Sequence, residues 1–204
     1  MFGIFKTKNP IEKFWNWFSE NEKNLRYFES NPDKYLNQIL TKGKSIESGL
    51  AFELEPPTDG IINMTISADG VKELFPLVEE IVSNSPKING WNFIAFRQRM
   101  PQDQVKGMIL KSENHELNPS EMKFFPMLEG NNLDIIIYIK GVTEENYNQA
   151  AYGGLLLLDN ILGEYDCVTK VRSYDFHNMP TTEQELNELK PLLELAEHVD
   201  KVKK

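Results

Sequence analysis

Apolar and polar residues alternate in two short stretches in the first half of the chain, residues 50–54 and 62–66. A two-residue period is typical of a β-strand with one buried face, and the Pro-Pro-Thr-Asp-Gly sequence between the stretches is a turn signal. Apolar residues then recur with helical spacing over residues 71–82, and a further apolar stretch begins at Trp91. The pattern therefore predicts two strands, a helix and a returning strand, which together make a ββαβ unit over residues 49–99.

The same order recurs in the second half of the chain. Alternating stretches at residues 124–128 and 133–139 flank a Gly-Asn-Asn turn, and a helical pattern follows over residues 147–162. Residues 165–176 then have the pattern of a returning strand. These elements predict a second ββαβ unit over residues 122–176. It is either a duplication of the first unit about a pseudo-twofold axis or a coincidental recurrence of a common order.

Helices flank the two units in the predicted organisation. Asn-Pro pairs at residues 9–10 and 31–32 combine a capping side chain with a proline suited to the first turn, and amphipathic stretches follow both pairs. They predict a helical hairpin over residues 9–48, and a capping box predicts a C-terminal helical tail over residues 181–204. The complete pattern predicts an α+β fold in a single domain, residues 1–204. In this fold the two ferredoxin-like ββαβ units form a largely antiparallel sheet with helices on one face.

Composition is that of an ordinary globular protein, and it limits the choice of partners. Asp and Glu outnumber Lys and Arg by 31 to 22, and the formal net charge of -9 opposes the electrostatic attraction that drives binding to DNA or RNA. The single cysteine, Cys167, excludes an internal disulfide framework and is typical of a reducing compartment. No apolar stretch approaches the roughly 20 residues that span a bilayer. We therefore expect a cytoplasmic protein that binds neither nucleic acid nor membrane.

Sequence motifs that would indicate catalysis, a cofactor or a metal are missing. The three histidines, His115, His177 and His198, stand in three different settings, so no helix presents the closely spaced ligands of a zinc site. Neither a phosphate-binding glycine loop nor a Gly-x-Ser-x-Gly elbow occurs. Cys167 is placed within the second returning strand, where a core role is favoured over a nucleophilic one. We predict no catalytic residue, no cofactor and no metal, although many enzymes lack a readable motif.

Four cations form the least ordinary cluster in the pattern. Arg97 and Arg99 belong to the first returning strand, and Lys170 and Arg172 belong to the second. If a pseudo-twofold axis relates the two strands, these side chains approach one another and could bind a carboxylate or phosphate through forked hydrogen bonds. The alternative is that they protect strand edges and pair with the abundant surface acids. The candidate contacts for an anion or a partner are Trp17, Arg97, Arg99, Lys170, Arg172, Tyr174 and His177.

One segment resembles known proteins. Residues 66–78, with the sequence ISADGVKELFPLV, are followed by Gly90-Trp91 and Ala95-Phe96-Arg97. Together they resemble a group of uncharacterised bacterial proteins of unknown function, and this resemblance covers most of the chain. The acidity and the ββαβ order are also similar to those of α+β proteins related to the ribonuclease-regulator B family, which act by binding an enzyme. The second resemblance implies a protein partner, and neither implies particular site residues.

These observations favour one class of function over another. The leading hypothesis is a non-enzymatic cytoplasmic protein that binds or regulates another protein, because the signatures of catalysis are missing. The alternative is an enzyme or a binding protein for a small anionic molecule, which would use a cleft between the two ββαβ units. In that case the strands that carry Arg97 and Arg172 would present the groups that bind the anion.

Overall fold

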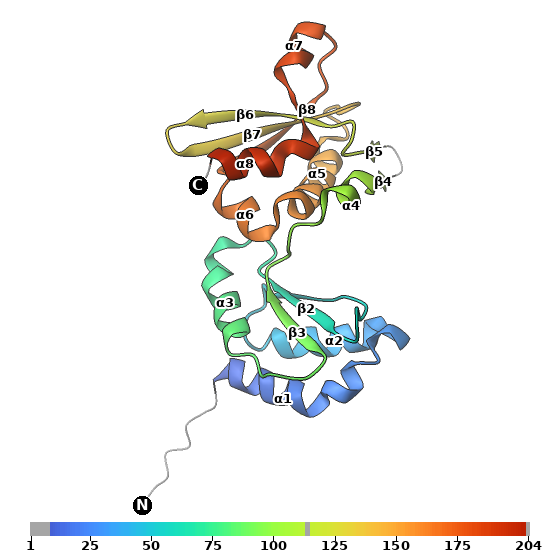
Figure 1. Cartoon of the computed structure of the whole chain (residues 1–204), viewed down its shortest axis with the longest axis vertical. Helices are drawn as coiled ribbons and strands as arrows, with labels where there is room; N and C mark the ends of the chain where they lie inside the picture. The colour runs from blue at the N-terminus through green and yellow to red at the C-terminus, as the bar shows by residue number, and fades with distance from the viewer. Residues whose placement is uncertain (1–8, 113–114, 203–204) are drawn as a thin grey trace, which may run out of the picture. The chain divides into compact units, whose positions relative to one another are not determined.

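The computed structural model describes residues 9–112 and 115–202 (Figure 1). The chain divides into two compact units, one ending at Arg97 and the other beginning at Gln98. We call them unit 1 and unit 2, where the sequence predicts a single domain over residues 1–204. Each unit has its own buried residues and its own main sheet. The helices and the mixed and antiparallel sheets confirm the predicted α+β class.

Unit 1 consists of a three-stranded sheet and the helices that pack on it. Its helices are α1 (Pro10–Leu25), η1 (Phe28–Ser30), α2 (Pro32–Gly43), η2 (Lys72–Leu74) and α3 (Phe75–Ser83). Its strands are β1 (Ala51–Leu54), β2 (Ile62–Ser67) and β3 (Trp91–Ala95). The strand order is β1-β2-β3, with β1 antiparallel and β3 parallel to β2. The connection between β2 and β3 contains α3, which gives the ββαβ order.

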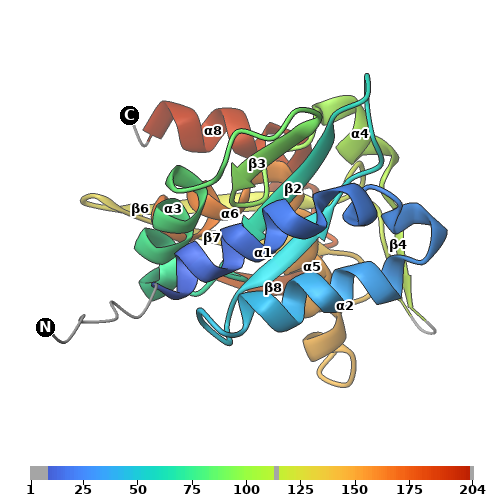
Figure 2. The ribbon, with the colours of Figure 1, turned by 90° about the horizontal axis from the view of Figure 1, so that it is seen from below.

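Local sequence explains where the helices of unit 1 begin. The side chain of Asn9 accepts a hydrogen bond from the backbone N–H of Ile11 at 3.1 Å, and Asn31 caps α2 in the same way. A proline follows each cap, at a position where the missing N–H costs nothing. Pro76 lies in the first turn of α3, so it does not interrupt the helix. As Figure 2 shows, α1 and α2 lie side by side.

The core of unit 1 is rich in aromatic side chains. Phe18 of α1 is fully buried and meets Trp91 edge-on, with ring centroids 4.9 Å apart. Trp15 meets Phe93 in the same way at 4.6 Å. The indole N–H of Trp15 donates a hydrogen bond of 2.9 Å to the backbone oxygen of Ile81, so the polar edge of the ring is satisfied inside the core. These contacts fix α1 against β3 and α3.

Unit 2 is built around a four-stranded sheet. Its helices are α4 (Gln102–Gly107), α5 (Tyr147–Leu162), α6 (Glu164–Thr169), α7 (Glu183–Glu188), η3 (Leu192–Glu194) and α8 (Leu195–Val202). Its strands are β4 (Leu110–Ser112), β5 (His115–Leu117), β6 (Lys123–Glu129), β7 (Asn132–Ile139), β8 (Ser173–Asn178) and β9 (Lys190–Pro191). The main sheet has the order β8-β7-β6-β9, and β4 and β5 form a separate pair. Strand β7 is antiparallel to β6 and parallel to β8.

The core of unit 2 is mainly aliphatic. Ile135, Ile137 and Ile139 occupy one face of β7 and are almost fully buried. Helices α5, α6 and α8 lie on one side of the main sheet (Figure 1). From them, Leu158 of α5 and Val199 of α8 join the same core. The two-residue alternation of β7 therefore corresponds to its buried face, as the sequence predicts.

Two details of the predicted fold are wrong. The strands do not form one continuous sheet, because the described residues contain three separate sheets. The pairing is largely antiparallel, as the sequence predicts, with one parallel pair in each main sheet. Residues 165–176 are not one strand, since α6 occupies Glu164–Thr169 and β8 begins at Ser173. The physical reason is that Glu164, Cys167 and Val171 are buried at helical spacing, after Gly163 ends α5 with a φ of 74°.

Candidate functional site

The four predicted cations already bind carboxylates of the chain itself. In unit 1, Arg97 follows β3, and its Nε atom lies 2.6 Å from Oε1 of Glu53 while a terminal nitrogen lies 3.0 Å from Oδ1 of Asp69. In unit 2, Arg172 precedes β8 and pairs with Asp134 and with Glu129. The Arg172 guanidinium lowers the pKa of Asp134 to about 2. Both arginines are therefore neutralised locally.

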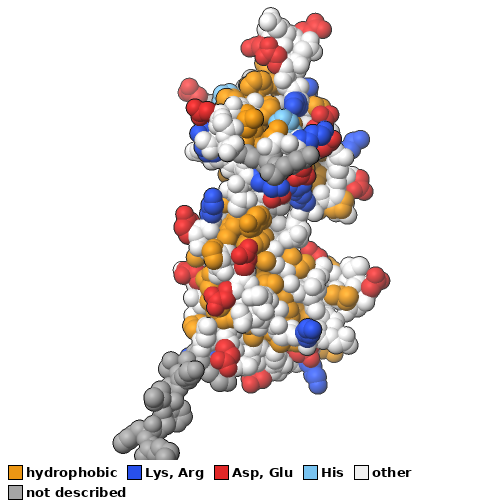
Figure 3. Space-filling view, turned by 60° about the vertical axis from the view of Figure 1, so that its left-hand side comes forward, with side chains coloured by type: hydrophobic (Ala, Val, Ile, Leu, Met, Phe, Trp, Pro, Cys, Tyr) orange, Lys and Arg blue, Asp and Glu red, His pale blue; other side chains and the backbone are white. Residues whose placement is uncertain are grey.

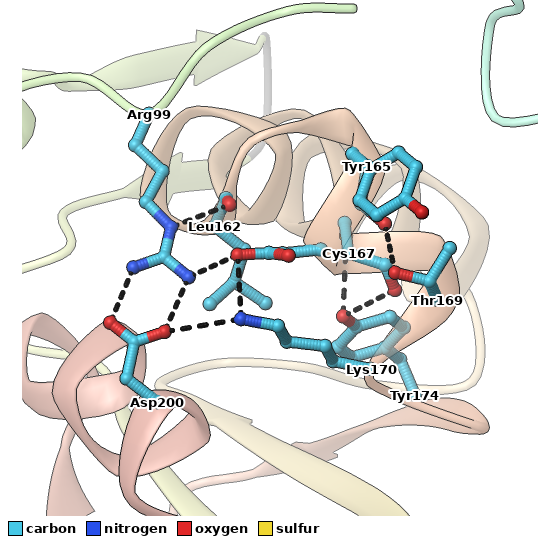
Figure 4. A network of polar contacts seen from close by, with 9 residues as sticks. Arg99, Leu162, Tyr165, Cys167, Thr169, Lys170, Tyr174 and Asp200 are labelled. Atoms are coloured by element: carbon cyan, nitrogen blue, oxygen red, sulfur yellow. Dashed lines mark hydrogen bonds and ion pairs between the residues drawn. The ribbon is translucent and has the colours of Figure 1, made fainter. Parts of the chain in front are cut away.

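Arg99 and Lys170 share one network of charges, which Figure 4 shows from close by. Arg99 Nε donates to the backbone oxygen of Leu162 at 2.8 Å, and its terminal nitrogens bind Asp200 at 2.7 Å and Asp166. Lys170 Nζ contacts the same two carboxylates, at 3.4 Å and 3.1 Å respectively. The network joins the end of α5 to α6 and α8. Two predicted cations are thus brought together, but around internal acids.

The buried Cys167 is hydrogen-bonded to the partly buried Tyr174. The hydroxyl of Tyr174 donates to the backbone oxygen of Cys167 at 3.0 Å and lies 3.2 Å from its sulfur. Burial raises the pKa of the Cys167 thiol to about 12, so the thiol is protonated and a poor nucleophile near neutral pH. Cys167 lies on α6 and not within a strand, but its core role agrees with the sequence-based interpretation.

His177 lies at the surface of β8. Its Nε2 atom is 2.8 Å from Oδ2 of Asp175, whose other oxygen accepts a hydrogen bond of 3.0 Å from the hydroxyl of Tyr147. The ring of Tyr138 meets the imidazole edge-on, with centroids 5.8 Å apart. A carboxylate that orients a histidine is one part of a nucleophilic triad. Within the described residues, this imidazole is hydrogen-bonded to no hydroxyl of a serine or threonine and to no thiol of a cysteine.

Helix α5 has an exposed apolar surface that the sequence interpretation missed. Tyr152, Leu155 and Leu156 are 68%, 44% and 42% exposed. We call these three residues the α5 face. They lie three and four positions apart, so they share one stripe of the helix. Leu155 falls on the apolar stripe of the helical pattern, yet its side chain is exposed.

The opposite side of α5 packs tightly against unit 2. Gly154 faces the ring of Phe176 so closely that a Cβ atom there would lie 2.2 Å from Cε1. Leu157 and Leu158 are fully buried on the same side. Asp159 is the one charged residue in this sixteen-residue helix. Residues 155–158 are four consecutive leucines, which at 100° per residue cannot all lie on one buried side of a helix, and this run was the signal that could have revealed the α5 face.

Trp17, the remaining candidate, lies half-buried on α1. The ammonium of Lys42 on α2 lies 5.7 Å from the centroid of its ring. Acidic and basic side chains are interspersed on the face of the molecule shown in Figure 3, without a continuous basic patch there. The sequence-based candidates are therefore distributed over several places in the two units.

The described residues contain no group of three His, Cys, Asp or Glu side chains that could hold a metal ion. Of the helices in the described part of the chain, none has the length and apolarity needed to cross a membrane. No protein-family model, curated protein or solved structure matches this chain.

Proposed function

We propose that this protein is a non-enzymatic cytoplasmic protein that binds another protein through the α5 face. The observation that supports this proposal is the exposure of Tyr152, Leu155 and Leu156 on one stripe of a helix. Contiguous apolar surface is costly in water, and on soluble proteins it marks interaction sites. Burial of these side chains against a partner would remove that cost.

The charge of α5 supports the same interpretation. Interface centres are depleted in charged residues and enriched in aromatic and aliphatic anchors. The α5 face offers one tyrosine and two leucines, and Asp159 is the only charge that its helix carries. The corresponding helix of unit 1, α3, instead carries Glu79 and Glu80 at exposed positions.

An anionic ligand held by the four predicted cations is less well supported. Such a ligand would have to displace carboxylates that already lie within hydrogen-bonding distance. Arg99 alone would lose contacts with Asp200 and Asp166. Exchanging one carboxylate for another yields little net free energy, because both are charge-assisted hydrogen bonds of the same kind.

We also propose that the two ββαβ segments are a structural duplication. Support comes from the pairing of the strands: an antiparallel hairpin, then a helix, then a strand parallel to the second strand, in both units. The test is an experimental structure. Superposition of residues 50–99 on residues 123–176 should align hairpin, helix and returning strand, and failure to align the helix would contradict the duplication.

The protein-binding proposal is tested by changing the α5 face alone. In Leu155→Gln/Leu156→Gln the apolar surface becomes polar while the helix backbone is kept, and the exposed positions predict little change in thermal stability. The partner is identified by crosslinking and mass spectrometry in the native cell and is then titrated as a purified protein. We expect the double variant to weaken this binding by at least about tenfold, a change of about 1.4 kcal/mol.

A matched control uses Leu128, which is 58% exposed at the end of β6. Leu128→Gln removes a similar apolar side chain from the same unit but leaves the α5 face intact, so it should keep wild-type affinity. Equal loss in both variants, or no loss in the double variant, would show that the α5 face is not the binding surface. If light scattering gives twice the chain mass and the double variant restores one chain mass, the partner is a second copy.

A further inference from the structure

A groove between α1 and α2 of unit 1 has an unusual lining for so acidic a chain. Its volume is about 480 Å³. Its lining residues are Trp17, Asn21, Lys34, Asn37, Gln38, Thr41 and Lys42. Two of the seven are lysines, four carry amide or hydroxyl groups, and none is an acid. Glu20 and Asp33, the acids adjacent in sequence, are not among them.

The two lysines of this groove differ from the other cations discussed above. Arg97, Arg99, Lys170 and Arg172 all bind carboxylates, whereas in the described part of the chain neither Lys34 nor Lys42 forms an ion pair. Both contact aromatic rings instead. Lys34 Nζ lies 4.9 Å from the centroid of Tyr35, and Lys42 Nζ lies 5.7 Å from that of Trp17. Their charge is therefore not cancelled by a neighbouring acid.

A larger hollow in unit 1 lacks this property. It has a volume of about 1010 Å³ and is bordered by loops at Gly60 and Gly90. The one cation in its lining, Arg26, is paired with Glu22 at 2.8 Å and stacks on Trp91. Size alone would favour this hollow as a ligand site, but its cation is already neutralised. The α1–α2 groove has the stronger chemical signal.

Both lysines belong to α2 and line the same groove. They are eight residues apart on α2, which is about 12 Å along a helix axis. Asn37, Gln38 and Thr41 line the groove between them and can donate hydrogen bonds to anionic oxygens. The side-chain amide of Asn21 is tied to the helix by a hydrogen bond of 2.8 Å to the backbone oxygen of Trp17.

We propose that the α1–α2 groove binds a small polyanion, a molecule with at least two phosphate or carboxylate groups. Lysine ammonium groups are compact point charges suited to phosphate and carboxylate oxygens. The volume lies within the range of small-molecule sites, roughly 300–1,000 Å³. This site lies in a different unit from the α5 face and uses a different chemistry, so either proposal can fail without the other.

The test titrates the 204-residue chain with pyrophosphate and with citrate. Binding is measured by calorimetry and by tryptophan fluorescence. Trp15 and Trp91 are only 4% and 7% exposed, so Trp17 should report binding. We expect saturable binding that weakens with added salt. Lys34→Gln/Lys42→Gln should raise the dissociation constant by at least about tenfold. Trp17→Phe should abolish the fluorescence change but keep the calorimetric signal.

Lys87→Gln is the charge-matched control. Lys87 is exposed in unit 1 and does not line the groove. The single variant Lys87→Gln should leave the affinity unchanged. The double variant Lys72→Gln/Lys87→Gln removes two charges, as the groove variant does, and should also leave the affinity unchanged. Binding of only one probe supports the proposal and identifies the anionic group as phosphate or carboxylate.

Three results would overturn the proposal. The first is that neither probe binds at millimolar concentration. The second is that the groove variant and the two-charge control lose affinity equally. The third is tighter binding of a tetraglutamate peptide than of both probes by at least about tenfold, because the occupant would then be an acidic protein segment.

Discussion

The crossover helices of the two units occupy the same position in the ββαβ order but have different outer surfaces. Helix α3 has nine residues and carries Glu79 and Glu80 at exposed positions. Helix α5 has sixteen residues and exposes Tyr152, Leu155 and Leu156. Since the strand pairing is the same, topology does not determine what each helix offers to other molecules. Function lies in the outward side chains and not in the order of the elements.

The cations of the two units fall into two groups, and Arg97 of unit 1 belongs with those that pair with acids. Unit 2 pairs Arg99, Lys170 and Arg172 with its own acids. Unit 1 leaves Lys34 and Lys42 on α2 against aromatic rings. Exposed lysines such as Lys72 and Lys87 also form no ion pair within the described residues, so what distinguishes Lys34 and Lys42 is that they line one groove. The comparison separates an apolar surface on unit 2 from a cationic groove on unit 1.

The largest expected effect concerns the aromatic core of unit 1. Phe18→Ala removes a fully buried ring that contacts Trp15, Trp91 and Phe93. We expect the free energy of unfolding of unit 1 to fall by about 3–5 kcal/mol. Hydrogen exchange at the backbone amides of β2 measures this loss of unfolding free energy. Phe18→Leu, which refills most of the space, should cost less, and a loss below about 1 kcal/mol in the alanine variant would refute the central role of this ring.

A smaller loss of stability is expected where a glycine lets helix α5 pack closely against strand β8. Gly154→Ala would place a methyl group 2.2 Å from the ring of Phe176, so either this buried ring or the helix would have to shift. We expect unit 2 to lose about 1–3 kcal/mol of stability. At the neighbouring Gly153, a methyl group would press on the end of the Leu117 side chain, 2.5 Å away, and would touch Leu110 at ordinary contact distance, so Gly153→Ala should cost less than Gly154→Ala. Denaturant titration of the two variants side by side checks the difference.

The same device in unit 1 allows the two units to be compared directly. A methyl group at Gly43 would lie 2.1 Å from the ring of Phe52. Gly43 is the last residue of α2, where the chain can adjust more easily than within a helix. We therefore expect Gly43→Ala to destabilise unit 1 less than Gly154→Ala destabilises unit 2. A larger loss in unit 1 would reverse this ranking.

The next effect concerns the buried hydroxyl in unit 2. Tyr174→Phe removes the hydrogen bond to the backbone oxygen of Cys167 and should lower stability by about 1 kcal/mol. Local loosening should also make the Cys167 thiol accessible. We expect iodoacetamide to label Cys167 slowly in the wild type and faster in the variant, with mass spectrometry as the readout. Rapid labelling of the folded wild type would contradict the burial of this thiol.

The smallest expected effect is that of acid on the network of Figure 4. Hydrogen bonds from Arg99 lower the pKa of Asp200 from 3.8 to about 2. A carboxyl group with a lowered pKa stabilises the fold above its unfolded pKa, and this stabilisation is lost as the pH falls from about 4 to about 2. Because Asp200 is half-exposed, the loss should stay below ~1 kcal/mol. Asp200→Asn should lack this pH dependence, and carboxyl NMR titration of Asp200 should give the lowered pKa directly.

Local patterns were sufficient to predict the strands with a strong alternation of apolar and polar residues. The alternation at residues 62–66 corresponds to β2, and that at residues 133–139 corresponds to β7. The pattern failed at residues 165–176, where Cys167 and Val171 fit helical spacing as well as part of a strand. Periodicity over so few residues does not distinguish the two structures, and the packing of the unit decided between them.

The candidate sites depended on contacts that a local pattern does not contain. Arg99 and Asp200 are 101 positions apart, and nothing near either residue indicates the other. The α5 face is different, because four consecutive leucines in α5 already signal that water meets an apolar surface. The groove at Lys34 and Lys42 required the relative position of α1 and α2 within unit 1, which amphipathic stripes alone do not specify.

The late position of β9 and α8 in the chain affects the order of folding during synthesis. Unit 1 has all its strands once Ala95 has been made, and domains fold from the N-terminus as they emerge. Unit 2 lacks Leu192, Leu195 and Val199, all fully buried in its core, until the end of α8 is made. The edge of β6 is unpaired until β9 is made, and the apolar face of the sheet is incompletely covered until α8 is made. The nascent chain is therefore most open to chaperones and to misassembly while unit 2 awaits its last helix.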